Sequence, residues 1–306
     1  MVSFVLSCGY QRWADHPPAR SKEEKQTMKR VVSIQDISCL GKCSLTVALP
    51  IISAMGVETC VVPTAVLSTH TGGFQNFTFH DLTGEVAPIA AHWKSQGITF
   101  DAIYTGYLGS FEQIDLVGKF FDDFGGDGTL VYVDPAMADH GVLYTGFTPE
   151  FALEMGKLCG KADVIVPNLT EAAFMLGEEY VGEDYDVDYI KGLLKRLTGL
   201  GCRTAVLTGV SFAPDQIGAM AYDSVTDTYA EYYNQKLPVQ FHGTGDVFAS
   251  ACVGALMNGQ DLTGALKVAV DYTLASIEET QKDPDARWYG VNFEAAIPML
   301  VHSLGR

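Results

Sequence analysis

The sequence predicts an α/β domain built around a mainly parallel sheet. Short apolar runs alternate with helical stretches of about ten residues or more, the pattern of β-α-β units. No segment rich in proline, glycine or serine interrupts this alternation after residue 30, and no internal repeat is present. Apolar residues make up 47% of the 306 residues, so the chain can bury a packed core. One doubly wound domain is therefore the simplest interpretation.

The predicted strands are short runs rich in β-branched and aliphatic residues, most of them ending at a polar residue, a glycine or a proline. They cover residues 31–35, 59–63, 102–105, 130–134, 164–166 and 205–208, followed by a predicted hairpin at 217–223 and 228–236. The predicted helices are longer, and several are followed by glycine or another turn residue. They cover residues 43–55, 82–96, 111–124, 151–160, 170–176, 189–200, 247–257, 263–281 and 293–304.

The first part of the chain does not share this pattern. Met1–Cys8 is mildly apolar but has neither a basic start nor a small-residue cleavage site, which argues against a signal peptide. The stretch after it is polar and contains Pro17 and Pro18. We expect residues 1–29 to be a disordered extension, or to follow a start codon assigned too far upstream, and residues 30–306 to form the domain.

The composition excludes several classes of protein. A net charge of −17 repels phosphate backbones and anionic headgroups, which argues against nucleic-acid and membrane partners. The seven cysteines are odd in number and include no C-x-x-C pair, as expected of reduced thiols in a cytoplasmic protein. Cys39 and Cys43 are a weak candidate for a metal pair, because no second pair completes a zinc site.

Several chemically distinctive residues lie at the carboxyl ends of the predicted strands. Ligands of doubly wound sheets bind just beyond these ends, so the residues mark where a site is expected. They are Asp36, Tyr107, Asp134, Asn168 and Thr208.

The sharpest local motif is His242-Gly243-Thr244-Gly245-Asp246, directly before an apolar helix. Two glycines let the backbone turn tightly, so that exposed N–H groups at the positive end of the helix can bind an anion. Asp246 can accept the proton of an attacking hydroxyl group, and at this helix start we expect its pKa to stay low. A loose phosphoryl-transfer transition state needs orientation more than deprotonation, so a weak base suffices. A glycine turn with an aspartate cap is an equally good interpretation of these five residues alone.

Two further motifs carry carboxylates. Asn168 and Glu171 are three residues apart at a helix start, where a carboxylate can hold magnesium, although a capped helix start explains the pair more simply. Asp134 precedes Pro135 at a strand end and can complete a cation site, or can be an ordinary turn residue.

The segment Ser68-Thr69-His70-Thr71-Gly72-Gly73 combines hydroxyl side chains with paired glycines. It fits a mobile flap over a substrate, or equally an ordinary surface loop, and His70 has no partner visible in the sequence. No G-x-x-x-x-G-K-[ST] loop, G-x-S-x-G elbow or G-x-G-x-x-G fingerprint is present.

Together these segments resemble the ribokinase-like superfamily, and within it the pyridoxal kinase (vitamin B6 kinase) group. The resemblance runs from about residue 30 to the C-terminus. It rests on VSIQ at 32–35, STHTG at 68–72, TGYLGS at 105–110, VDP at 133–135, VPNLTE at 166–171 and GTGD at 243–246. Each motif is modest alone, and their order and number make the set specific.

The resemblance implies an αβα sandwich that transfers the γ-phosphoryl group of ATP to the 5′-hydroxymethyl group of a B6 vitamer. It implies ATP, Mg²⁺ and a monovalent cation such as K⁺ as cofactors, and a cytoplasmic homodimer. The implied catalytic base is Asp246, and the implied anion hole is Gly243, Thr244 and Gly245. Thr71 and Tyr107 match substrate-pocket positions, Asn168 and Thr208 match ATP contacts, and Asp134 and Glu171 match the cation site.

Two residues depart from the family pattern. Asp36 stands where many pyridoxal kinases have a serine beside the pyridine nitrogen, and a carboxylate there favours a protonated pyridinium. Gly209 follows Thr208 where some relatives have another hydroxyl group, so one phosphate contact is missing or replaced.

Three alternatives stay open. Hydroxymethylpyrimidine kinases share the histidine before the Gly-Thr-Gly turn but often have cysteine at the position of Asp246. Sugar and nucleoside kinases usually show an early paired-glycine motif that this chain lacks. A non-catalytic vitamin-binding protein on the same fold would show binding without ADP formation.

Overall fold

A nine-stranded sheet runs through the computed structural model, which describes residues 28–305. From one edge to the other its strands are β11 (Thr228–Gln235), β10 (Gln216–Asp223), β9 (Thr204–Val210), β8 (Val164–Ile165), β5 (Leu130–Val133), β4 (Ala102–Thr105), β1 (Arg30–Leu40), β2 (Glu58–Thr69) and β3 (Phe79–Asp81). The strands from β9 to β2 pair in parallel, whereas β3, β10 and β11 pair antiparallel at the two edges. The predicted mainly parallel α/β sheet is confirmed.

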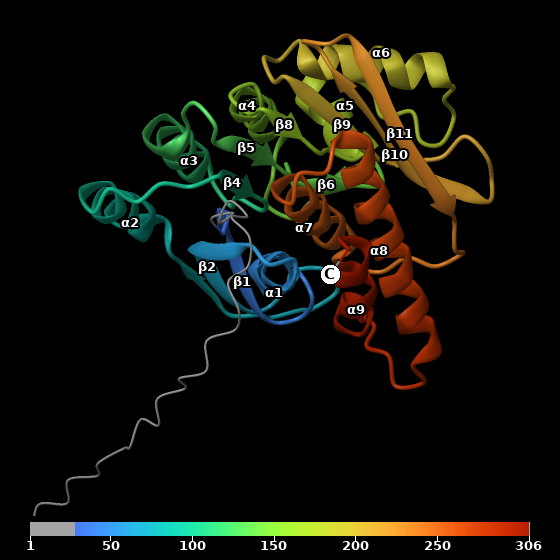
Figure 1. The fold of residues 1–306 in the computed structure, drawn as a ribbon, viewed down its shortest axis with the longest axis horizontal. Coiled ribbons are helices and arrows are strands. Elements are labelled where there is room, and N and C mark those ends of the chain that lie inside the picture. Colours follow the sequence, from blue (N-terminus) through green and yellow to red (C-terminus); the bar gives the residue numbers. More distant parts are fainter. Residues whose placement is uncertain (1–27, 306) are drawn as a thin grey trace, which may run out of the picture.

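Helices cover both faces of the sheet, which gives three layers (Figure 1). One face carries α2 (Thr83–Ser95), α3 (Phe111–Phe124), α4 (Pro149–Cys159), α5 (Leu169–Leu176) and α6 (Val187–Thr198). The other carries α1 (Leu45–Ala54), α7 (Thr244–Met257), α8 (Leu262–Lys282) and α9 (Phe293–Ser303). The αβα sandwich is therefore confirmed as well.

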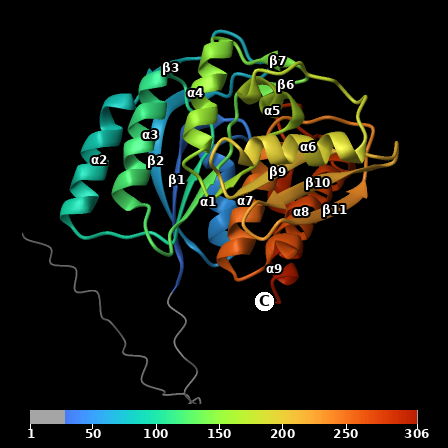
Figure 2. The ribbon, with the colours of Figure 1, turned by 90° about the horizontal axis from the view of Figure 1, so that it is seen from above.

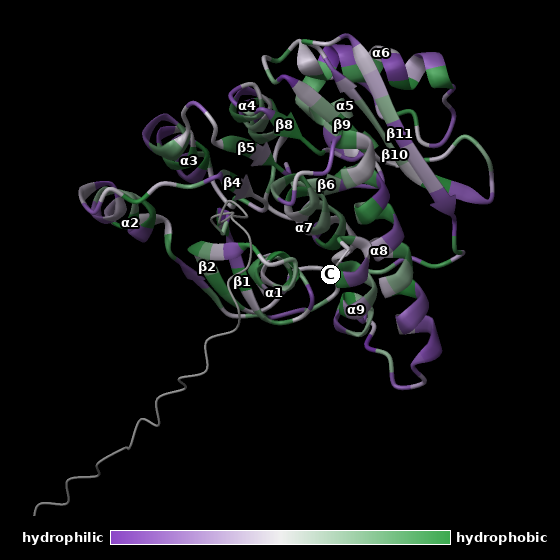
Figure 3. Ribbon diagram, viewed as in Figure 1, coloured by the Kyte–Doolittle hydropathy of each residue, from purple (hydrophilic) through white to green (hydrophobic). Residues whose placement is uncertain are grey.

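The strands alternate their side chains between two separate cores. Val32 and Ile34 of β1 pack under α2–α6, while Val31 packs under α1 and α7. Because both faces are covered, the parallel strands read as continuous apolar runs, with polar residues concentrated at their ends. Figure 3 shows hydrophilic residues on the outer surfaces of α2, α6 and α8, away from the sheet.

Two strands extend beyond their predicted carboxyl ends. The strand predicted at 31–35 continues as β1 to Leu40, and the one predicted at 59–63 continues as β2 to Thr69. The register between β1 and β2 shifts between Gln35 and Ile37, so Asp36 lies at an irregularity in the ladder. The strands β3, β6 (Ala138–Asp139) and β7 (Val142–Leu143) are unpredicted, because two or three residues carry no periodicity. The extension predicted for residues 1–29 lies outside the described residues, except for Met28 and Lys29.

The carboxyl ends of the parallel strands all lie on one side of the molecule, which we call the carboxyl edge. In Figure 2 this edge is at the top, where β3, β6 and β7 lie, and β1 enters from the opposite side. The loops after β1, β2, β4, β5 and β8 all emerge there, so residues far apart in the sequence meet at one place.

Gln113 joins three elements near this edge. Its side-chain Nε2 donates hydrogen bonds to the Thr64 carbonyl oxygen at 3.2 Å and to Thr83 Oγ1 at 2.8 Å, and its Oε1 accepts one from the Gly109 N–H at 2.7 Å. The side chain and Thr64 are buried, and the Thr64 carbonyl oxygen also accepts from the Leu82 N–H at 3.0 Å. Gln113 therefore holds α3 against β2 and the start of α2.

Replacing Gln113 by alanine should lower the free energy of unfolding by about 2–3 kcal/mol, because the three hydrogen bonds of a buried side chain are lost. Urea denaturation followed by circular dichroism measures the change. Glu112→Ala, at the exposed neighbouring position of the same helix, is the control and should shift the midpoint little. Equal effects of the two substitutions would contradict the role given to Gln113.

Candidate active site

Three aspartates from separate elements meet at the carboxyl edge of the sheet. Asp36 lies in β1, Asp134 follows β5, and Asp246 lies in the first turn of α7. Their charges act on one another, because Asp36 raises the pKa of Asp246, and Asp246 raises that of Asp134. The structure thus brings together residues that the sequence placed more than 200 positions apart.

The glycine-rich turn before α7 is shaped by close backbone contact. Gly243 has a φ of 78°, and a Cβ atom there would lie 1.9 Å from the Lys42 carbonyl oxygen, so any side chain would collide with the β1–α1 loop. At Gly245 a Cβ atom would meet nothing within 4 Å, so this side of the turn is open. The first N–H groups of a helix lack acceptors within the helix, which makes this turn suited to an incoming anion.

The expectation that the pKa of Asp246 stays low is wrong. Desolvation raises it to about 7, the backbone N–H of Ser44 opposes this shift, and the Asp36 charge adds to it. The helix start alone would stabilise the charged form, but loss of water and a second carboxylate outweigh it. Asp246 is therefore a stronger base than the sequence indicated, with a pKa close to neutrality.

Ser44 and Cys43 belong to this site, and sequence reasoning missed both. Ser44 has a φ of 55°, unusual for a residue with a side chain, and its backbone N–H and hydroxyl group favour the charged forms of Asp246 and Asp36 respectively. Burial and the charges of both aspartates raise the pKa of the Cys43 thiol well above its ordinary value, so Cys43 stays protonated. No sequence signal marks the strained backbone at Ser44.

Asp36 and Tyr107 form a second part of the site. Asp36 is 4% exposed and accepts a hydrogen bond from Ser38 Oγ at 3.0 Å, and burial raises its pKa. Burial, with a contribution from the Asp36 charge, raises the pKa of Tyr107 to about 12. The Tyr107 ring lies 5.4 Å from that of Phe147, and Thr71 is exposed in the loop after β2.

Asp134 and Glu171 lie together on the side of the site away from Asp36. Glu171 is already engaged, because its Oε2 accepts from the Asn168 N–H at 2.8 Å and its Oε1 from the Met137 N–H at 3.2 Å. Burial raises the pKa of Glu171 to about 8 despite these bonds. Asp134 makes no side-chain hydrogen bond to any described residue, and burial and the Glu171 charge raise its pKa well above the ordinary value.

This pair of carboxylates fits a hard divalent cation such as Mg²⁺, whose charge would relieve their repulsion. Among residues 28–305, no group of three or more His, Cys, Asp or Glu side chains is arranged to hold a metal ion. The same finding covers Cys39 and Cys43, which gain no further ligands in the described part of the chain. Any cation at Asp134 would therefore need ligands from a bound phosphate group and water.

Asn168 and Thr208 are neighbours across adjacent strands, joined by an isolated parallel bridge. The Asn168 side chain accepts from the Glu171 N–H at 2.9 Å and donates to the Ala138 carbonyl oxygen at 2.9 Å, so together with Glu171 it forms a capping box at the start of α5. The capped helix start weighed from the sequence is thus present. The phosphate contacts expected of Asn168 and Thr208 stay predictions.

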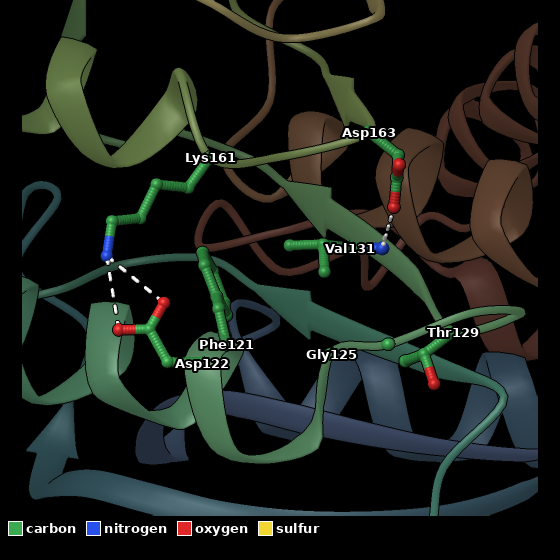
Figure 4. A pocket seen from close by; sticks show the side chains of 8 residues that line it. Phe121, Asp122, Gly125, Thr129, Val131, Lys161 and Asp163 are labelled. Carbon is green, nitrogen blue, oxygen red and sulfur yellow. Dashed lines mark hydrogen bonds and ion pairs between the residues drawn. The ribbon is translucent and has the colours of Figure 1, made fainter.

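A pocket on the described part of the chain lies at the opposite ends of the strands (Figure 4). It is lined by residues near the amino ends of β5 and β8, among them Asp122, Val131, Lys161 and Asp163. Lys161 Nζ lies 3.3 Å from Asp122 Oδ1, and Asp163 Oδ2 accepts from the Val131 N–H at 2.7 Å. Lys161 is paired with Asp122 and Asp163 with a backbone N–H, so the carboxyl edge is the better candidate. Within residues 28–305, no helix combines the length and the apolarity that crossing a bilayer requires.

Comparison with known proteins identifies the family. The family model described as phosphomethylpyrimidine kinase matches residues 48–287. A Bacteroides thetaiotaomicron protein, provisionally described as a phosphomethylpyrimidine kinase and crystallised with pyridoxal, is 39% identical, with a TM-score of 0.84 over 89% of this chain and 96% of its own. Pyridoxal kinase from Lactobacillus plantarum is 30% identical, with a TM-score of 0.81 over 90% of this chain and 98% of its own.

A curated relative extends this set. The pyridoxine/pyridoxal/pyridoxamine kinase of Bordetella avium is 29% identical over 262 residues, which cover 82% of this chain and 85% of the relative. The family match spans well over half of the chain, and the solved relatives share its three-layered fold. The chain therefore belongs to the phosphomethylpyrimidine kinase family of ribokinase-like kinases, and pyridoxal kinases are among its relatives.

Proposed function

We propose that this kinase transfers the γ-phosphoryl group of ATP to the 5′-hydroxymethyl group of a B6 vitamer, giving ADP and the vitamer 5′-phosphate. The observation that carries the proposal is the position of Asp246, a carboxylate with a pKa of about 7 at the open end of α7, beside Gly243, Thr244 and Gly245. A base and an anion-binding turn on the same half-turn of helix suit phosphoryl transfer to a hydroxyl group.

In the proposed reaction Asp246 orients the vitamer hydroxyl group and accepts its proton as the new O–P bond forms. The bond between the γ-phosphorus atom and the bridging oxygen of ADP breaks, and the N–H groups of the turn stabilise the negative charge on the transferred group. Asp134, with Glu171 beside it, would hold Mg²⁺, which neutralises phosphate charge when bound. Asn168 and Thr208 are proposed to lie near the ATP phosphates. A monovalent cation stays a prediction from the resemblance.

The substrate assignment rests on Asp36 and Tyr107. Asp36 is buried beside Asp246, and no lysine or arginine of the described chain contributes to lowering the pKa of either carboxyl group. Such a site favours a ligand that carries positive charge, such as a pyridinium ring. Tyr107, close to Asp36, supplies an aromatic face for that ring. The pyridoxal complex of the Bacteroides relative supports this choice.

Hydroxymethylpyrimidine kinase is the second candidate, because the matching family model is described as phosphomethylpyrimidine kinase. The aspartate at position 246, where such enzymes often have cysteine, favours the vitamer. A non-catalytic pyridoxal-binding protein is a weaker alternative, since the base, both glycines and both cation-site carboxylates are present. The cytoplasmic homodimer is proposed from the family resemblance alone.

The decisive assay is ADP release from Mg-ATP with pyridoxal, pyridoxine, pyridoxamine, hydroxymethylpyrimidine and ribose offered separately. We expect turnover of a B6 vitamer, with kcat/KM rising as the pH increases through about 7, because Asp246 must be ionised to accept a proton. Asp246→Asn should reduce kcat by roughly 100- to 10,000-fold, the usual contribution of a general base. Turnover with hydroxymethylpyrimidine alone would support the second candidate, and binding without turnover would support the third.

Asp36→Asn tests the recognition of a pyridinium. The isosteric amide should raise the vitamer KM by about tenfold, because a charge-assisted hydrogen bond is lost. In the wild type KM should be lowest where the ring is protonated and Asp36 is ionised, and this dependence should disappear in the variant. Without the Asp36 charge, the rise of kcat with pH should also move to lower pH. An unchanged KM with an unchanged pH dependence would rule out this role.

Asp134→Asn should stabilise the ligand-free protein at pH 8, raising Tm by about 2–4 °C. The folded-state pKa of Asp134 lies above the unfolded-state value, so stability falls as the pH rises through this interval and the carboxylate ionises. The neutral amide avoids that loss. Calorimetry should also show that Mg-ATP stabilises the variant less than the wild type. Asp127→Asn, at an exposed position in the turn after α3, is the control. If Asp134→Asn raises Tm no more than Asp127→Asn does, the prediction is contradicted.

A further inference from the structure

Three distant segments meet beside the anion-binding turn. The loop after β2 contributes His70 and Phe74, the residue before Gly243 is His242, and the loop between α8 and α9 contributes Trp288 and Tyr289. The His70 ring lies 5.0 Å from Phe74, 5.2 Å from His242 and 6.3 Å from Trp288, measured between ring centroids. We call residues 68–73 the flap. His70 is 5% exposed, so this flap histidine is buried at the centre of the cluster.

The hydrogen bonds of His70 require one neutral tautomer. The Gly72 N–H donates to Nδ1 at 3.1 Å, so Nδ1 must carry a lone pair. Nε2 lies 2.9 Å from the Tyr289 carbonyl oxygen, which can only accept, so Nε2 must carry the proton. The Nε2 bond therefore joins the flap to the loop between α8 and α9, whereas the Nδ1 bond fixes the turn within the flap and exists only while His70 is uncharged.

The flap glycines are seated against the same rings. A Cβ atom at Gly72 would lie 2.9 Å from the His242 ring, and one at Gly73, which has a φ of 82°, would lie 2.7 Å from Trp288. Gly41 of the β1–α1 loop presses on the other side, since its Cβ atom would lie 2.3 Å from the His70 ring. The paired glycines noted in the sequence are thus required by a docked flap, and Thr71 directly precedes Gly72, which is seated against His242.

We propose that His70 is a positioning residue that, in its neutral form, holds Thr71 and Gly72 of the flap in the turn seated against His242, and that protonation of His70 releases this part of the flap. The proposal rests on the proposed function, because it assigns the flap to the substrate pocket of the same site. His70 acts through Thr71 and the turn, and has no part in moving the phosphoryl group.

Protonation would place a hydrogen on Nδ1, facing the Gly72 N–H, and would break that hydrogen bond. His242 is the titratable group that acts on His70 from the facing segments of the described chain. Lys42, next to Gly41, points elsewhere, with its Nζ 3.0 Å from Asn292 Oδ1 and 2.8 Å from Glu294 Oε2. Burial lowers the pKa of His70, the Tyr289 carbonyl group opposes this shift, and His242 adds to it. We therefore expect the flap to be released only below pH 6.5, the ordinary pKa of histidine.

The kinetic test compares His70→Phe, which keeps an aromatic ring but loses both hydrogen bonds, with the exposed control His92→Gln on α2. We expect His70→Phe to raise the vitamer KM by about tenfold, as loss of two hydrogen bonds implies, with kcat changed less than threefold. The rise of the wild-type KM below pH 6.5 should be absent from the variant and retained in the control. His70→Gln, which keeps a donor toward Tyr289 without a titrating ring, should lie between them and should also lack the pH step. Equal KM values and pH profiles in all four proteins would overturn the proposal.

Trp288 gives a readout that needs no activity. Trp13→Phe and Trp93→Phe together leave Trp288 as the only one of the three tryptophans. Its fluorescence emission should change below pH 6.5 as the released part of the flap moves away from the Trp288 ring. The amplitude of this pH titration curve should fall when His70→Phe is added. Superimposable titration curves with and without His70→Phe would overturn the role of His70, even if a vitamer is phosphorylated. Curves that differ, without turnover of any vitamer, would support the role of His70 and refute the proposed function.

Discussion

Concentration of negative charge at one edge of a covered sheet is the constraint on which this site depends. Asp36, Asp134 and Asp246 reach that edge from β1, β5 and α7, and no lysine or arginine of the described chain contributes to lowering the pKa of any of the three carboxyl groups. Burial therefore raises all three pKa values, and the ligand-free site is held at a cost in folding free energy. A divalent cation and a cationic ring would each relieve part of that cost. Ligand binding and site chemistry thus share one electrostatic origin.

The α7 start is the element that makes this arrangement usable. Gly243 can approach the Lys42 carbonyl only because it has no side chain, and the approach sets where the helix begins. The helix behind it is almost entirely buried between α1, α8 and the sheet, so its first turn cannot move freely. Ser44, in the facing loop, has a strained backbone conformation that directs its N–H toward Asp246. A rigid helix and a strained loop therefore hold the Asp246 carboxyl group in place.

The flap contrasts with this rigid part. Its contacts are aromatic edges and two hydrogen bonds to one imidazole, and Thr71 and Gly73 are exposed. Such an attachment has less buried apolar area than the α7 packing and opens at lower free energy. With the proposed roles of Asp246 and Thr71, the base would stand on a rigid helix and the substrate contact on a weakly attached loop, which would separate chemistry from access to the site.

The sequence by itself determined the α/β class, the parallel sheet and the bounds of β4 and α3, because apolar periodicity and strand-end glycines are local signals. It also identified the strand-end aspartates, since ligand sites of doubly wound sheets follow a general rule. Only the tertiary structure decided the pKa of Asp246, the strain at Ser44, the hydrogen bond from the Met137 N–H to Glu171 and the bond between His70 and Tyr289. Each of these depends on desolvation or on contacts between segments far apart in the chain, and neither quantity is encoded in a local pattern of residues.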